Sequence, residues 1–178
     1  NLLVNVIGYR LAHARFPYSF DPYVDSVFAQ AADLAAGRPV YQDPATAPVR
    51  ECFYPPLFPA LLAGVITLTG VRLGAAHGLG LALGLAVLGT LGAIVRRRTG
   101  SAAAGWGAAL ALAMCQRSLS YPIGAPRVDD LALLLGLLTL DAMDRADRSW
   151  GAWWTAVLCG AAAPFAKQTA VFALAAGL

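Results

Sequence analysis

The sequence is poor in charge and in metal-binding side chains. Asp, Glu, Lys and Arg make up 13% of its residues, whereas 58% are hydrophobic and the mean hydropathy is +0.62. An ordinary soluble domain has about 25% charged residues. The two histidines and three cysteines lie far apart, so their spacing predicts neither a disulfide framework nor a metal site. The net charge of +3 is small and does not indicate a nucleic-acid partner, because arginines placed beside a membrane would account for it. We also expect no cofactor.

Apolar stretches recur along the chain, and a membrane-spanning helix needs about 20 such residues. The stretches are residues 2–9, 57–69, 73–95, 102–115 with an extension to 119, 128–143, 153–165 and 169–178. The sequence therefore predicts an all-α fold, a polytopic transmembrane helical bundle in a multi-pass integral membrane protein. Because the first and last stretches are cut by the ends of the chain, we expect a fragment of a longer protein.

Two arginine-rich segments predict the orientation of this bundle. Residues 96–98 are three arginines, and residues 144–148 include two more. The positive-inside rule places both segments in the cytoplasm, so that Lys167 lies on the extracytoplasmic side. Residues 57–69 are few for a span and begin after two prolines, which favours a re-entrant or interfacial helix. We therefore expect residues 10–71 to form one extracytoplasmic segment with juxtamembrane helices.

The first polar segment carries two acids near the start of an expected helix. Residues 25–37 read as a short amphipathic helix that ends at Gly37. Asp21 precedes Pro22, which is typical of an N-cap followed by a first-turn proline. Asp25 lies one turn later on the same face. The two carboxylates are candidates for a general base, which removes a proton from an acceptor, and the N-cap remains the structural alternative for Asp21.

Lys167 is the only lysine of the chain and lies in an apolar run. An ionisable side chain in such a place marks a functional site or snorkels to the lipid headgroups, and the sequence leaves both possibilities open. Arg127 and Asp129 begin another apolar run. They are candidates for contacts with an anion. The structural alternative is that the acid is there because the dipole at the start of a helix favours a negative charge.

The order of these motifs resembles that of a known family. The motifs are Asp21 and Asp25, the run 31–41, Tyr54-Pro55-Pro56-Leu57, Arg127-Val128-Asp129, and Ala166-Lys167-Gln168-Thr169. Together they are similar to the N-terminal half of membrane glycosyltransferases with the GT-C fold. The resemblance is strongest to the group of dolichyl-phosphate-mannose protein mannosyltransferases and bacterial lipid A aminoarabinose transferases.

The resemblance implies an enzyme that transfers a sugar from a polyprenyl-phosphate donor to an acceptor on the extracytoplasmic face. The family's catalytic acid maps to Asp21 or Asp25. Its lysine at the outer end of a later helix maps to Lys167, facing the carrier phosphate, and its second acid maps to Asp129. The resemblance does not define the acceptor, which is a protein, a lipid or a glycan.

This sequence departs from the family at one motif. Many members carry an acid and a base directly before the two prolines, where this chain has Phe53 and Tyr54. Arg50 or Glu51 is then the candidate to replace that contact, beside Tyr54.

Two other functions compete with the transferase. A flippase or transporter for lipid-linked sugars would place polar residues through the helix centres, whereas these are almost purely Ala, Leu, Gly and Val. A non-catalytic membrane subunit is the third possibility.

Overall fold

The structure is a computed structural model that describes residues 22–41, 43, 45, 54–118 and 126–175. Within these residues all regular structure is helical and no strand occurs, which confirms the predicted all-α fold. The elements are α2 (Pro22–Ala35), α3 (Leu57–Thr69), α4 (Leu73–Thr99), α5 (Ala102–Ser118), α6 (Val128–Met143), the 3₁₀ turn η1 (Ala146–Arg148), α7 (Trp150–Ala166) and α8 (Ala170–Ala175).

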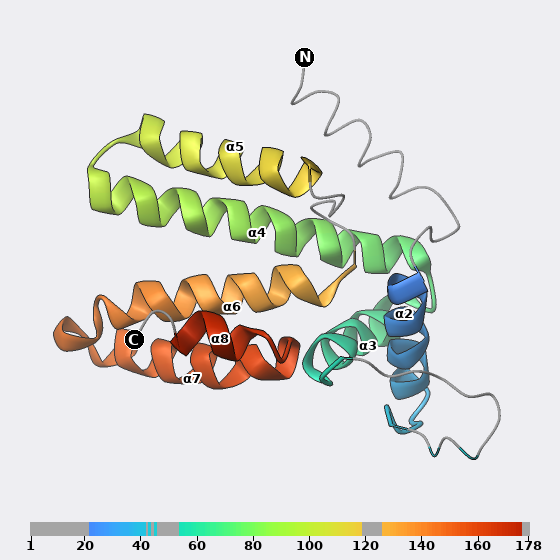
Figure 1. The fold of residues 1–178 in the computed structure, drawn as a ribbon. Helices are drawn as coiled ribbons and strands as arrows, with labels where there is room; N and C mark the ends of the chain where they lie inside the picture. The colour runs from blue at the N-terminus through green and yellow to red at the C-terminus, as the bar shows by residue number, and fades with distance from the viewer. Residues whose placement is uncertain (1–21, 42, 44, 46–53, 119–125, 176–178) are drawn as a thin grey trace.

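Four helices lie side by side and make the body of the bundle. Figure 1 shows α4, α5, α6 and α7 running back and forth, with α4 packed against α5 and α6, and α6 packed against α7. The short α8 follows α7 and contacts both α6 and α7. At one end of the bundle α2 and α3 pack against each other, and α3 also contacts α4 and α7.

The helix limits follow from local sequence signals. Glycines with positive φ follow three helices: Gly37 (76°), Gly70 (81°) and Gly100 (69°). After α2, the backbone N–H of Gly37 bonds the carbonyl of Leu34, and that of Arg38 bonds Asp33, which satisfies carbonyls left open at the helix end. The predicted end at Gly37 is therefore confirmed. The helix begins at Pro22, as its interpretation as a first-turn proline predicts, and not at Asp25, where the amphipathic run was expected to start.

A cluster of buried apolar side chains lies where α2 and α3 meet the bundle. Phe58 and Leu62 of α3 are fully buried in it. Its other members come from α2, α3, α4, α6 and the end of α7: Val27, Ala31, Ala63, Ile66, Ala76, Leu83, Val128, Leu131, Ala132 and Ala166. This core ties α2 and α3 to the start of α6 and the end of α7, and it thereby sets the positions of the polar residues there.

Among the described residues, α4 is the helix that is long and apolar enough to cross a membrane. Only 28% of its most apolar stretch is buried inside the protein. The apolar helices α3 and Ala102–Cys115 are shorter. Large apolar side chains on several helices also face outward, among them Leu85, Trp106, Met114 and Leu158.

Glycines allow α4 and α5 to approach closely. A Cβ placed on Gly105 would lie 2.6 Å from the carbonyl oxygen of Gly92, closer than real Cβ atoms come. Small residues at a helix interface allow such an approach. A Cβ at Gly92 would likewise meet the Gly105 carbonyl oxygen, at 3.3 Å, whereas Gly78 and Gly89 have open space around them.

Candidate functional site

Lys167 lies at the break between two helices. Helix α7 ends at Ala166, and Lys167 follows with an extended backbone (φ −154°, ψ 129°) before α8 begins at Ala170. Its N–H still bonds the carbonyl of Ala163, 3.0 Å away, so the turn stays joined to α7. The ammonium is thus held at a helix end, and 31% of the side chain is exposed.

Asp129, in the first turn of α6, is the partner of Lys167. The Lys167 Nζ donates a hydrogen bond to Asp129 Oδ1 across 38 positions of sequence. The other carboxylate oxygen, Oδ2, lies 3.6 Å from Arg127 Nε. A negative side chain is favoured at a helix N-terminus, so both the helix dipole and two cations stabilise the Asp129 carboxylate. The structure therefore brings together three residues that the sequence singled out one by one.

Arg127 also connects this group to α2. Its guanidinium carbon lies 6.0 Å from the ring centroid of Tyr23, at the outer limit for a cation–π contact. Only 16% of the Arg127 side chain is exposed. We call Tyr23, Arg127, Asp129 and Lys167 the Lys167 cluster. Among the described residues it joins the cations Arg127 and Lys167 to the Asp129 carboxylate, while Arg127 and the buried neighbour Asp130 each have a further interaction within the chain.

A cavity of about 350 Å³ opens beside the Lys167 turn. Seven residues line it: Tyr41, Tyr54, Pro55, Pro56, Pro164, Phe165 and Gln168. They come from the segment that leads into α3 and from the end of α7. Tyr54, predicted as a substrate contact, therefore faces this cavity rather than joining the Lys167 cluster.

Asp25, one of the two predicted acids of the first segment, is not part of the Lys167 cluster. Asp25 is exposed in the first turn of α2. It follows Tyr23 by two residues, which is about 200° around a helix, so the two side chains leave α2 on nearly opposite sides. Asp21, Arg50 and Glu51 lie outside the described residues.

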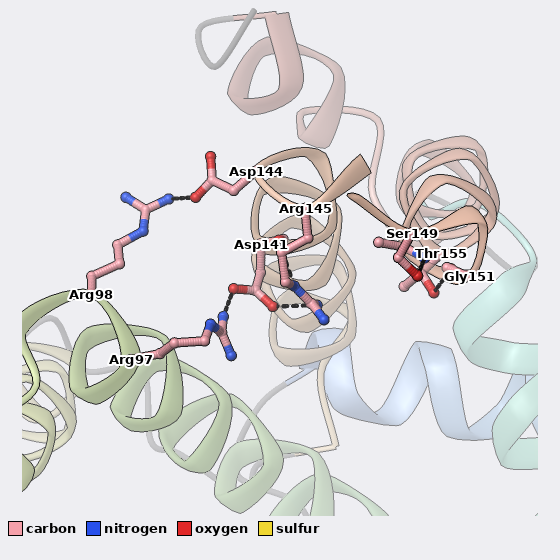
Figure 2. Close-up of polar contacts among 9 residues, drawn as sticks. Arg97, Arg98, Asp141, Asp144, Arg145, Ser149, Gly151 and Thr155 are labelled. Atoms are coloured by element: carbon pink, nitrogen blue, oxygen red, sulfur yellow. Dashed lines mark hydrogen bonds and ion pairs between the residues drawn. The ribbon is translucent and has the colours of Figure 1, made fainter. Parts of the chain in front are cut away.

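The opposite end of the bundle carries a second group of charges (Figure 2). Asp141 of α6 is buried, pairs with Arg97 of α4, and accepts a hydrogen bond of 2.6 Å from Arg145. Next to it, Arg98 pairs with Asp144, and both of these side chains are more than half exposed. The two arginine-rich segments therefore share one end, and the Lys167 cluster lies at the other.

Sequence reasoning missed four parts of this arrangement. The contact of Tyr23 with Arg127 and the pair of Arg97 with Asp141 join distant segments and depend on the fold. The spacing of Asp141 and Arg145, four residues apart on a helix, was a usable signal for an ion pair. The cavity unites residues from separate loops and helix ends, for which no sequence signal existed.

Comparison of the chain with known protein families, with curated proteins and with solved structures finds no match. The geometry and chemistry of the Lys167 cluster and the neighbouring cavity are thus the basis for a functional assignment.

Proposed function

We propose that this chain belongs to a multi-pass membrane glycosyltransferase with a GT-C-like helical bundle. It transfers a sugar from a polyprenyl-phosphate donor to an acceptor on the extracytoplasmic face. The observation that carries this proposal is the Lys167 cluster: two cations and a carboxylate meet at one end of the bundle, opposite the arginine-rich end.

A membrane location is supported by what the helices expose. Helix α4 is long and apolar, and most of its surface is not covered by protein. All four tryptophans lie in the first two turns of α5 and α7, near the arginine-rich end, and all are exposed: Trp106, Trp150, Trp153 and Trp154. Aromatic side chains gather at membrane–water interfaces, and arginines mark the cytoplasmic side. This assignment puts the Lys167 cluster on the extracytoplasmic side.

The Lys167 cluster suits a lipid phosphate. The ammonium of Lys167 is a compact charge with three donors, of which Asp129 takes one. Phosphate oxygens accept charge-assisted hydrogen bonds from such cations. As the sugar leaves its carrier, negative charge grows on the phosphate, and cations fixed in place stabilise that charge without having to move.

In the proposed step, an oxygen of the acceptor attacks the anomeric carbon of the donor sugar. The bond between that carbon and the phosphate oxygen breaks, and polyprenyl phosphate leaves with the bonding electrons. The acceptor proton passes to a carboxylate. Asp21 and Asp25 are the candidates for that carboxylate, and Asp25 is exposed to solvent.

Sealed membrane vesicles of opposite orientation test both the activity and its side. A water-soluble, short-chain prenyl-phosphate sugar, labelled in the sugar, is supplied from outside the vesicles. We expect turnover in right-side-out vesicles and none in inverted ones. The Asp21→Asn, Asp25→Asn double variant should lose turnover, whereas Asp147→Asn, an exposed acid at the arginine-rich end, should keep it. Full activity of the double variant would remove the proposed base, and turnover only in inverted vesicles would overturn the orientation.

A further inference from the structure

The cavity beside Lys167 has the composition of a site for an uncharged ring with several hydroxyl groups. Tyr41, Tyr54 and Phe165 supply aromatic faces, and three prolines supply apolar surface. The polar groups that line it are two phenol hydroxyls and the Gln168 amide. Each of these donates and accepts hydrogen bonds and has capacity beyond a single partner. Ligand sites are typically apolar pockets of about 300–1,000 Å³ with a few such polar groups, and this cavity is of that size.

The position of the cavity connects it to the phosphate contact. Phe165 and Gln168 flank Lys167 in the chain, at the turn between α7 and α8. In a polyprenyl-phosphate sugar the ring is joined directly to the phosphate. Under the proposed function, a phosphate held by Lys167 therefore brings its sugar to the turn whose residues Phe165 and Gln168 line the cavity.

The lining also restricts the kind of sugar. None of the seven residues that line this described cavity carries a charge. Among these described lining residues, a cationic amino sugar would find no carboxylate for its ammonium, and a uronic acid would find no cation for its carboxylate. Placing either charge there is costly, because a charge out of water needs a partner.

We infer that this cavity holds the sugar ring of the donor, and that the sugar is a neutral hexose or pentose rather than an amino sugar or a uronic acid. The inference rests on the proposed function, since it takes the ligand of Lys167 to be a sugar-bearing lipid phosphate. A prenyl tail is the poorer occupant, because it offers no hydrogen-bond partner to two tyrosines and a glutamine.

Binding measurements in lipid nanodiscs test this inference, since sugar-headed detergents would compete for the site. The probes are decaprenyl phosphate, a panel of its neutral hexosyl and pentosyl esters, and its 4-amino-4-deoxyarabinosyl ester. We expect at least one neutral ester to bind about tenfold more tightly than the bare phosphate, and the amino sugar ester to show no such gain.

Two variants test whether the tighter binding of the neutral sugar ester arises in the cavity. Phe165→Ala removes a side chain that is 60% exposed and does not contribute to the core, so folding is preserved. Phe165→Ala and Gln168→Ala should each reduce the gain by about threefold to tenfold and leave binding of the bare phosphate unchanged. Leu158→Ala is the matched control, because Leu158 is an exposed apolar residue of the same helix away from the cavity.

The outcomes separate the inference from the proposed function. A sugar gain that survives both variants, or a gain for the amino sugar ester above every neutral ester, overturns the inference alone. Binding of the bare phosphate that depends on Lys167, without a gain for any neutral ester, also overturns it and leaves the phosphate site standing. If no probe binds the wild-type chain, the proposed function fails and the inference fails with it.

Discussion

Replacing Lys167 by alanine should weaken donor binding far more than it weakens the fold. Lys167 and Asp129 have 31% and 33% of their side chains exposed. Pairs with such access to solvent contribute roughly 0–1 kcal/mol, so the free energy of unfolding should fall by no more than about 1 kcal/mol. A hydrogen bond between a cation and a phosphate is worth about 1.5–3 kcal/mol. Its loss should therefore reduce the affinity for polyprenyl phosphate by about tenfold to a hundredfold.

Variants of Lys167 and of Asp129 should change the affinity for polyprenyl phosphate in opposite directions. Lys167→Arg keeps the charge and should retain part of the binding. Asp129→Asn keeps the shape of the side chain and removes the negative charge that competes with the phosphate. Two unit charges about 4 Å apart interact by about 1 kcal/mol in water, so this variant should bind bare polyprenyl phosphate about fivefold more tightly.

The assay is equilibrium binding of bare polyprenyl phosphate to the protein in nanodiscs, with thermal unfolding measured on the same samples. Unchanged affinity in Lys167→Ala would reduce Lys167 to a membrane anchor. An equal loss of affinity in Asp129→Asn and Lys167→Ala would show that the intact ion pair is what binding needs, which contradicts the competition described above.

Two further predictions concern the packing of the bundle, and thermal or denaturant unfolding checks both. Asp141→Asn should lower the free energy of unfolding by about 1.5–3 kcal/mol, because a buried carboxylate with two arginine partners loses its charge. Asp144→Asn, in a pair that is more than half exposed, should lower it by no more than about 1 kcal/mol. Equal losses in the two variants would contradict the argument from burial. Gly105→Ala should cost about 1–3 kcal/mol because its Cβ meets the Gly92 carbonyl. Gly107→Ala, with open space around it, should be neutral or stabilising by up to about 1 kcal/mol, and a Gly105→Ala variant of the same stability would refute the close approach.

Helix limits were predictable where a charge, a proline or a glycine bounds an apolar run. Both ends of α3 and of α6 agree with their apolar stretches. The end of α4 was placed at 95, but arginine is a good helix former, so the helix continues through the three arginines to Thr99 before Gly100. Similarly, α7 begins at Trp150 rather than 153, because the Ser149 hydroxyl accepts a hydrogen bond from the Ala152 N–H and caps the helix.

Three of the four members of the Lys167 cluster stand out in the sequence, whereas Tyr23 and the contacts between the members do not. Chemistry singled out Lys167, Arg127 and Asp129, since charged groups in apolar runs are costly unless they serve a purpose. That Lys167 meets Asp129 depends on α6 starting at the same end of the bundle where α7 finishes, which no local signal contains. The contact of Arg127 with Tyr23 additionally requires α2 to pack across that end.

Different interactions hold the helices together at the two ends of the bundle, so salt and detergent affect the stability of the two ends differently. At the arginine-rich end, α4 and α6 are tied by ion pairs whose arginines are about half exposed. Salt weakens exposed pairs such as Arg98 with Asp144 more than it weakens the pairs of the buried Asp141, so high ionic strength acts on this end mainly through the exposed pair. The other end is held by the apolar core of α2, α3, α4 and α6, which salt strengthens and harsh detergents dissolve. High salt and a harsh detergent therefore weaken helix packing at opposite ends of the protein. A detergent that leaves the α2–α3 core intact is needed to preserve the Lys167 cluster.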